Sequence, residues 1–510
     1  MLRNNLFRQV VVGIAGALVG ATSVTGTAAA APDPLERFER QAVEWRTCGV
    51  EVLDASGVQC ADITVPLDYS RPEGRTITVA ISRMMATDPA RRRGVLLGNP
   101  GGPGGTGLVQ GLAVSAVLAS DVLAQYDLIG MDPRAVGRST PVDCGWPVDR
   151  YLRAPEPGVA GFAREVALQA DLAARCAAAL GDTMSAYTTR NTARDMNVIR
   201  AALGEPALNY YGMSYGTYLG AVFAQMFPDR IGRLVLDSAV DPDSYGSGET
   251  LTQGASSEAA LDDWAAWAAG QDARYHLGTT AAEVRSGVEG LVHRVTERPI
   301  DVNGHVVDGS SLPLLLYLPL HSYYVNDAYA VLVRQLLDAA DGRPVTLNPG
   351  DWLTAYFDNA DTEVNTSAEA VIECGDAAVP RDPHRYWTNI ERARVTQPIF
   401  GALSNNISPC AFWPAPAEPP TVVRNAIPAL IVQATGDPRT PLAGAEALRR
   451  AMTGARLLTV EGMRAHVLLI AVITDLFDNG SVDDARLRCV RDATNEYLRD
   501  GTLPASDVTC

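Results

Sequence analysis

The stretch "YYGMSYGTYLG", residues 210–220, holds Ser214 between two glycines. The pattern G-x-S-x-G is short and arises easily by chance, so its surroundings decide its meaning. An apolar run, residues 207–214, precedes the serine, and apolar residues at helical spacing follow it over 219–227, up to Pro228. This order predicts a strand, a tight turn that carries Ser214 and a helix, an arrangement that holds a serine hydroxyl clear of the backbone.

Short β-rich runs, separated by turns and helical patterns, extend along the rest of the chain. They cover residues 63–69, 76–85, 94–100, 126–132, 207–214, 232–239, 429–437 and 455–462. From residue 94 onward the runs are almost continuously apolar, which indicates a parallel sheet covered by helices on both faces. A helix is also expected over Thr192–Leu203, opened by a capping box from Thr192 to Asp195.

A long helical segment separates the sixth of these runs from the seventh. It is rich in alanine, leucine and tryptophan, and its uncharged part, residues 309–324, is interrupted by prolines, so we expect a cap surface there and no membrane span. The sequence therefore predicts one α/β domain split by a helical cap. The expected boundaries are 32–240 and 425–510 for the α/β core and 241–424 for the cap.

The N-terminus has the features of a secretory signal peptide over residues 1–31. Arg3 and Arg8 precede an apolar stretch and a run of alanines, with cleavage expected near Ala30 or Ala31. A membrane anchor is the alternative, but the strongly apolar part is short for a span. Cleavage would take the formal net charge from −17 to −19. That balance disfavours nucleic acid and anionic membranes as partners.

The cysteine count fits an exported protein. The eight cysteines all follow residue 31, and an even number outside the cell indicates disulfides. The spacing alone does not fix the connectivity. We expect the sequential pairing, which closes only local loops: Cys48–Cys60, Cys144–Cys176, Cys374–Cys410 and Cys489–Cys510. Neither a zinc site nor any other metal site or cofactor is expected, because no C-x-x-C and no cysteine–histidine pair at ligand spacing occurs.

Two further residues follow sheet runs in the order that a serine hydrolase requires. Serine is a poor nucleophile without a general base, and His466 is the histidine that follows the last sheet run. Asp437 ends the apolar run before it, although a plain G-D-P turn would explain that residue too. The order Ser214, Asp437, His466 is that of the α/β-hydrolases. We therefore predict an α/β-hydrolase fold in which His466 takes the proton of Ser214 and Asp437 orients the imidazole.

A glycine-rich stretch, "LLGNPGGPGGTG" at residues 96–107, can supply the donors for an oxyanion. The backbone N–H groups of Gly102 and Tyr215 are the expected pair. The same glycines also satisfy the dinucleotide-binding fingerprint, with Asp132 as the later acid. That alternative is weaker, since Pro103 removes a donor from the loop and the triad would be left unexplained.

Several segments together resemble the secreted tripeptidyl aminopeptidases of actinomycetes, serine exopeptidases related to prolyl aminopeptidases. The segments are "NPGGPGGTG", "YDLIGMDPRAVGRST", "YYGMSYGTYLGAVFAQMFPDRIGRLVLDS", "GDPRTP" and "CVRDATNEYLRDGTLP". The resemblance runs from about residue 60 to the C-terminus. It implies release of short N-terminal peptides through an acyl-enzyme, with Ser214, Asp437 and His466 in the roles given above, peptides with a free N-terminus as substrates and no metal. The family usually has glycine where Ala135, Ala465 and Val467 stand.

An aminopeptidase must hold the substrate ammonium at a fixed distance from its serine. In a partly dry cap this requires a carboxylate or several carbonyl oxygens. Glu373 and Asp376, beside Cys374, are the candidates. The alternative is that both are solvated acids next to a structural disulfide.

Two other functions use parts of the same sequence. A secreted esterase or lipase-like hydrolase would share the triad but ignore a free amine. A non-catalytic binding protein on the hydrolase fold would commonly lack a triad member, whereas all three are present here. The sequence does not predict the side-chain preference or the oligomeric state.

Overall fold

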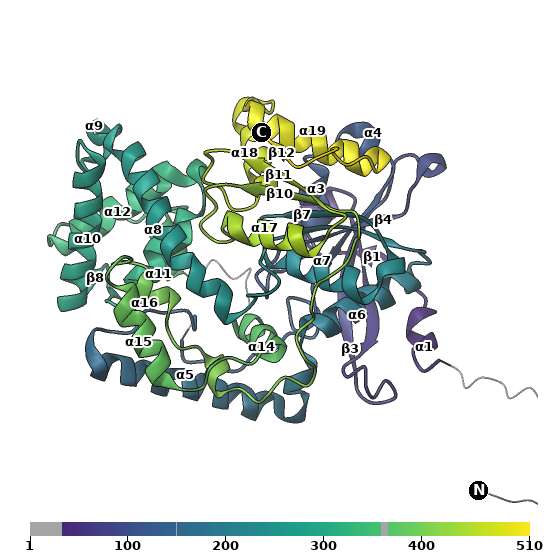
Figure 1. Cartoon of the computed structure of the whole chain (residues 1–510), viewed down its shortest axis with the longest axis horizontal. Coiled ribbons are helices and arrows are strands. Elements are labelled where there is room, and N and C mark those ends of the chain that lie inside the picture. Colours follow the sequence, from purple (N-terminus) through teal and green to yellow (C-terminus); the bar gives the residue numbers. More distant parts are fainter. Residues whose placement is uncertain (1–32, 149, 359–365) are drawn as a thin grey trace, which may run out of the picture.

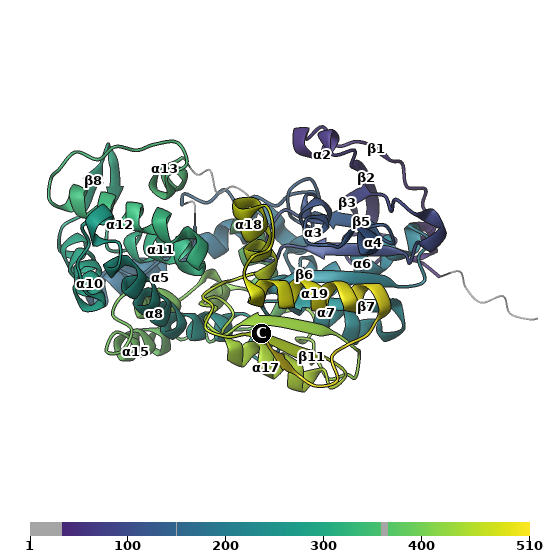
Figure 2. The ribbon, with the colours of Figure 1, turned by 90° about the horizontal axis from the view of Figure 1, so that it is seen from above.

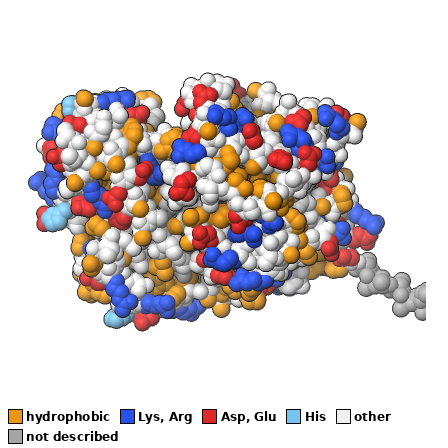
Figure 3. Space-filling view, turned by 45° about the horizontal axis from the view of Figure 1, so that its top comes forward, with side chains coloured by type: hydrophobic (Ala, Val, Ile, Leu, Met, Phe, Trp, Pro, Cys, Tyr) orange, Lys and Arg blue, Asp and Glu red, His pale blue; other side chains and the backbone are white. Residues whose placement is uncertain are grey.

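The computed structural model of the chain describes residues 33–148, 150–358 and 366–510. The expected signal peptide, residues 1–31, lies outside the described residues. In the part that is described, no helix combines the length and the apolar character that a membrane crossing requires. Basic and acidic side chains are interspersed over the face drawn in Figure 3.

A ten-stranded sheet forms the centre of the larger body (Figure 1). Its order is β1-β2-β3-β5-β4-β6-β7-β10-β11-β12. The pairs from β1 to β5 along this order are antiparallel, and all the later pairs are parallel. The strands are β1 (Arg46–Thr47), β2 (Gln59–Pro66), β3 (Thr76–Met84), β4 (Val95–Asn99), β5 (Asp127–Met131), β6 (Leu208–Met213), β7 (Ile231–Asp237), β10 (Leu430–Ala434), β11 (Arg456–Val460) and β12 (Val508–Thr509).

Helices cover both faces of this sheet, as the apolar strands predict. One face packs against α6 (Thr189–Ala202), α7 (Tyr215–Met226) and α17 (Leu442–Ala451). The other packs against α3 (Gln110–Ser115), α4 (Ser120–Leu123), α18 (Leu468–Asn479) and α19 (Ala485–Asp500). Figure 2 shows α18 and α19 in yellow. The short α1 (Glu36–Glu39) and α2 (Glu51–Ala55) precede the first long strands. The architecture is the three-layered, mostly parallel α/β-hydrolase fold that the sequence predicts.

The segment between β7 and β10 is mostly helical and forms the second body seen in Figure 1. It has its own hydrophobic core, separate from those of the sheet. Its elements are α8 (Ser247–Ala269), α9 (Asp272–Tyr275), α10 (Ala281–Glu297), the hairpin β8 (Ile300–Val302) and β9 (His305–Val307), α11 (Leu312–Tyr317), η4 (Leu318–His321), η5 (Tyr323–Val325), α12 (Asn326–Ala340), α13 (Trp352–Phe357), α14 (Thr366–Asp376), α15 (Pro383–Ala393), α16 (Gly401–Ser404) and η6 (Pro409–Phe412).

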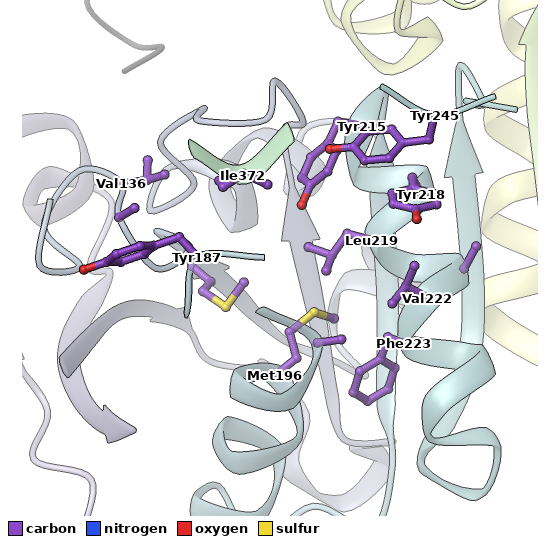
Figure 4. Packing of buried hydrophobic residues seen from close by; sticks show 14 of the residues in the cluster. Val136, Tyr187, Met196, Tyr215, Tyr218, Leu219, Val222, Phe223, Tyr245 and Ile372 are labelled. Carbon is purple, nitrogen blue, oxygen red and sulfur yellow. The ribbon is translucent and has the colours of Figure 1, made fainter. Parts of the chain in front are cut away.

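Two helices cross the boundary expected between core and cap. The chain around the start of α5 (Gly158–Leu180), with Ala154 and Phe162, packs into the hydrophobic core of the cap, although it precedes β6. Helix α14 does the reverse, since Ile372 lies with residues of α6 and α7 in the core of the sheet domain (Figure 4). The cap is therefore built from two stretches of chain, and α14 lies against the α/β core.

The capping box expected at Thr192 is wrong. Helix α6 begins at Thr189, and the hydroxyl of Thr188 accepts a hydrogen bond from Asn191 N at 3.2 Å. Asp195 is instead fully buried and forms a bidentate ion pair with Arg134, with N–O distances of 2.7 and 2.6 Å.

The eight cysteines form four disulfides, all in the expected sequential pairing: Cys48–Cys60, Cys144–Cys176, Cys374–Cys410 and Cys489–Cys510. The third one ties α14 of the cap to η6. It thus fixes the helix that carries Glu373.

Candidate active site

Ser214 occupies the turn between β6 and α7 in a backbone conformation that few L-residues adopt, with φ 55° and ψ −127°. Glycine is required at both flanking positions, because neighbouring atoms lie too close to leave room for a Cβ. A Cβ on Gly212 would lie 2.3 Å from the carbonyl oxygen of Gly216, and one on Gly216 would lie 2.7 Å from Oδ1 of Asn99. The hydroxyl is thus presented at the N-terminus of α7.

Asp437 follows β10, two strands along the sheet from β6, and its side chain is fully buried. Its oxygens accept hydrogen bonds from the backbone N–H groups of Arg439 at 2.8 Å and Thr440 at 3.0 Å. The Thr440 hydroxyl donates to Oδ2 at 2.9 Å. These donors fix the plane of the carboxylate.

His466 follows β11, and its Nδ1 lies 2.9 Å from Oδ2 of Asp437. Because a carboxylate only accepts, Nδ1 carries the proton and Nε2 is left as the basic nitrogen. The side chain is 14% exposed, so the ring is held in protein but reaches open space. Such an imidazole can accept a proton from a nearby hydroxyl.

Ser214 and His466 line one cavity of about 320 Å³, together with Gly102. No hydrogen bond joins the Ser214 hydroxyl to His466 among the residues that the structure describes. Hydrogen bonds of this kind often tighten only when substrate binds. The two groups share the space in which a substrate carbonyl would lie.

The loop that carries His466 is anchored by two residues at the end of β7 that the sequence analysis did not select. Asp237 accepts hydrogen bonds from Leu468 N at 2.9 Å and Leu469 N at 2.8 Å, the first two residues of α18. Ser238 Oγ accepts from Val467 N at 2.8 Å. Burial raises the pKa of Asp237 to about 6, against the lowering effect of these N–H donors. Its place at the end of an apolar strand was the available sequence signal.

Two of the three residues that stand where the family usually has glycine adopt a positive φ. Ala135 has φ 74° and Val467 has φ 67°, whereas Ala465 is not among the residues with positive φ. This conformation is unfavourable for any residue with a Cβ, and most for a β-branched one. The loop beside His466 is therefore held against a local backbone preference by its contacts.

The cap holds this loop from the other side. Backbone hydrogen bonds run from His466 N to His321 O and from Tyr323 N to Arg464 O, each of 2.9 Å. The buried Arg464 side chain donates to Asp263 Oδ2 on α8 at 2.8 Å and to the carbonyl oxygen of Leu320 at 3.0 Å. The position of the base thus depends on both bodies of the molecule.

The two predicted oxyanion donors lie beside Ser214. Gly102 lines the cavity, and Tyr215 is the first residue of α7. Neither of their backbone N–H groups donates to another group within the described chain. Both are therefore available to a substrate oxygen.

The dinucleotide alternative does not fit the loop geometry. Oδ1 of the buried Asp132 accepts hydrogen bonds from Gly107 N at 2.8 Å and Leu108 N at 3.2 Å, and Oδ2 accepts from Arg138 N at 2.8 Å. Gly107 serves close packing, since its Cβ would lie 2.0 Å from the Met131 carbonyl oxygen. Asp132, the acid that would have to bind a ribose, therefore fixes the backbone of the glycine-rich loop.

The structure separates the two acids that were candidates for the ammonium site. Glu373 lines the cavity that contains Ser214, and the Tyr151 hydroxyl donates to its Oε2 at 2.8 Å. Burial raises the pKa of Glu373 to about 7. Tyr151 was not predicted, because no motif in the sequence links it to residue 373.

Asp376 does not line this cavity. Its oxygens accept from Thr189 N at 2.7 Å and from the Thr189 hydroxyl at 2.6 Å, at the start of α6. Asp376 therefore holds the start of α6, whereas Glu373 lines the cavity of Ser214, as does Glu369.

The fold and this arrangement of serine, histidine and acid define a serine hydrolase. The chain belongs to the alpha/beta hydrolase fold family, whose pattern matches residues 94–470. It is 35% identical to the tripeptidyl aminopeptidase of Streptomyces lividans, in an alignment that covers 99% of this chain and 97% of that protein. The resemblance read from the motifs is thereby confirmed.

Two mycobacterial proteins are also similar over most of their lengths. Serine protease Hip1 of Mycobacterium tuberculosis is 30% identical, with 98% of this chain and 96% of that protein covered. Carboxylesterase B of the same species is 31% identical, with 97% and 94% covered. Together with the tripeptidyl aminopeptidase, Hip1 supports a serine peptidase of the α/β-hydrolase family.

Proposed function

We propose that this chain is a secreted serine aminopeptidase that releases short peptides, tripeptides first among them, from free N-termini. The observation that carries the proposal is the carboxylate of Glu373 in the cavity of Ser214 and His466. A charged ammonium that leaves water needs such a partner, and an esterase substrate has no use for one.

The chemistry follows from the groups in the cavity. The Ser214 oxygen attacks the carbonyl carbon of the scissile amide while its proton passes to Nε2 of His466. The N–H groups of Gly102 and Tyr215 stabilise the oxyanion. His466 then gives the proton to the departing amine as the C–N bond breaks. A water molecule, deprotonated by the same ring, hydrolyses the acyl-enzyme and restores the serine.

The test compares tripeptide p-nitroanilides with a free and with an acetylated N-terminus. The proposal predicts cleavage of the free form and a loss of about tenfold or more in kcat/KM on acetylation, because one buried charge pair is lost. Mass spectrometry of the products from defined longer peptides gives the number of residues released. Equal cleavage of both anilides contradicts the aminopeptidase assignment.

An esterase is the second candidate, favoured by the similarity to Carboxylesterase B. It predicts turnover of p-nitrophenyl acyl esters and no preference for a free amine. Glu373→Gln separates the two functions: it lowers peptide cleavage and leaves ester hydrolysis unaffected if Glu373 acts on the ammonium.

Export is supported by the four disulfides and by the leader-like residues 1–31. Expression of the full chain in an actinomycete host should give active protein in the medium, with a mature N-terminus near Pro32. Activity that stays with the cells, with residues 1–31 intact, contradicts this part of the proposal.

A further inference from the structure

Arg439 is a charged residue in the cavity of Ser214 for which the chemistry above has no use. It lies two positions after Asp437 and lines the same cavity as Ser214, His466 and Glu373. Its backbone is held in place, since Arg439 N donates to Asp437 Oδ1 at 2.8 Å and Gln253 Nε2 donates to the Arg439 carbonyl oxygen at 3.0 Å.

Within the described part of the chain, the Arg439 guanidinium contacts only uncharged groups of the cap. Nη2 donates to the carbonyl oxygens of Tyr317 at 2.8 Å and Leu318 at 3.1 Å. The guanidinium carbon lies 3.2 Å from the centroid of the Tyr317 ring. Nη1 is buried and has no hydrogen-bond partner among the residues that the structure describes. Burial, with no acid to oppose it, lowers the pKa of this group well below its usual value.

The two most deeply buried arginines of the described chain, Arg134 and Arg464, form ion pairs. Arg134 forms its ion pair with Asp195, and Arg464 forms one with Asp263. No described carboxylate pairs with Arg439. Arg439 is partly exposed to the cavity, and a cation that loses part of its hydration without gaining an anion is unfavourable.

We propose that Arg439 recognises a carboxylate of the substrate and makes the enzyme selective for acidic peptides. A planar guanidinium with an unused N–H suits a carboxylate, and it completes its pairing only when substrate is bound. Two sources supply this group: an acidic side chain on the acyl side of the scissile bond, or the free C-terminus of a short peptide on the leaving side. The proposal rests on the peptidase function proposed above.

The test uses substrate pairs that differ by one charge. One pair carries Glu or Gln as the last residue before the scissile bond, and the other ends in a free carboxylate or an amide. The wild-type enzyme is expected to prefer the acid in one of the pairs by about tenfold or more in kcat/KM, the value of one charge-assisted hydrogen bond. The pair that responds identifies the source.

Three variants show whether Arg439 causes the preference. In Arg439→Met the ratio of acid to amide should fall to near one, and Arg439→Lys should retain part of it. Arg334→Met, which removes an arginine paired with Asp338 on the same helix of the cap, should keep the full ratio. If Arg439 only clamps η4, Arg439→Met will weaken acid and amide substrates alike, and the proposal is wrong.

A binding measurement separates this proposal from the peptidase assignment. Calorimetry on the Ser214→Ala protein compares the same acid and amide peptides without turnover. Tighter binding of the acid form, lost when Arg439→Met is added, supports the carboxylate site even if no peptide is cleaved. Equal binding of both forms overturns it, whatever the enzyme hydrolyses.

Discussion

Ser214 combines the reactive group with one of the least favourable backbone conformations in the chain. At φ 55° and ψ −127° it has the dihedral angles of a position that glycine usually fills. Such a residue costs about 1–3 kcal/mol, which the contacts around the turn offset. The conformation has a function, because it holds the Ser214 hydroxyl away from the backbone.

Replacing Ser214 by glycine should therefore stabilise the fold relative to Ser214→Ala. Both variants lose the hydroxyl, but only glycine relieves the strain, and its greater freedom when unfolded takes back about 0.5–1 kcal/mol. We expect a free energy of unfolding about 1 kcal/mol higher for Ser214→Gly, measured by urea denaturation. A less stable glycine variant would show that the turn is not strained.

Glu373 should give peptide cleavage a pH dependence that ester hydrolysis lacks. Its pKa of about 7 means that the carboxylate which binds an ammonium forms as the pH rises through 7. The ratio of kcat/KM for a free-amine anilide to that for a neutral ester should rise there. It should fall again as the substrate amine deprotonates near about 8. His466 serves both substrates and cancels in the ratio.

The matched variant for this measurement is Glu373→Gln, which should flatten the ratio across the whole range. The same pKa also affects stability. Because this pKa lies above the usual glutamate value of 4.5, the folded state holds the proton more tightly, and the contribution of Glu373 to stability falls from about pH 4.5 to 7. A ratio that is independent of pH in the wild type would remove Glu373 from the amine site.

At the scale of elements, the sequence predicted the sheet better than its surroundings. All eight expected strands exist, with ends that differ by a few residues, because buried parallel strands form continuous apolar runs. The two-residue strands β1 and β12 and the β8–β9 hairpin were missed, since such short elements depend on neighbours that a sequence window does not contain. The N-terminal capping box of α6 was predicted at the wrong residues for a related reason, because Asp195 forms an ion pair with Arg134 across the core.

Arg464 connects the histidine loop to the cap, and its removal should affect both stability and the base. In Arg464→Met the carbonyl oxygen of Leu320 loses its donor and the Asp263 pair is lost, which should cost about 2–3 kcal/mol of unfolding free energy. Displacement of His466 should lower kcat for peptides and esters alike. Arg464→Lys should recover part of the rate.

Arg274→Met is the control for this prediction, because the Arg274–Asp327 pair lies in the same cap but is largely exposed. An exposed pair contributes little, so this variant should change stability by no more than about 0.5 kcal/mol. If Arg464→Met is destabilised but hydrolyses esters at the wild-type rate, Arg464 supports the cap and does not position the base.

At the scale of the whole molecule, the site is assembled from segments that lie far apart in the chain. The triad residues could be found from the sequence because each follows an apolar strand in a known order. Tyr151 and the separation of Glu373 from Asp376 could not be, since they depend on how α5 and α14 cross between core and cap. The predicted boundaries divide the chain by residue number, whereas in the folded protein the core of the cap also includes residues around the start of α5.

The Cys374–Cys410 disulfide should therefore matter for amine recognition as well as for stability. Its removal by a double alanine variant frees a loop with a sequence separation of 36, which the chain-entropy estimate values at about 4 kcal/mol. Helix α14 should then hold Glu373 less firmly. We expect a smaller preference for the free N-terminus over the acetylated one.

Removal of Cys489–Cys510, with a separation of 21, is the matched control. It should cost about 3 kcal/mol by the same estimate and leave the preference intact, because Cys489 lies in α19 and this disulfide does not hold α14. Equal effects of the two double variants on the preference would contradict the role given to α14.

The most direct test of the account is the reaction of the protein with a fluorophosphonate probe, followed by tandem mass spectrometry of the labelled peptide. We predict a single adduct on Ser214 that is lost in Ser214→Ala and forms much more slowly in His466→Gln and Asp437→Asn. An adduct on another residue, or labelling of Ser214 at an unchanged rate without His466, would contradict it.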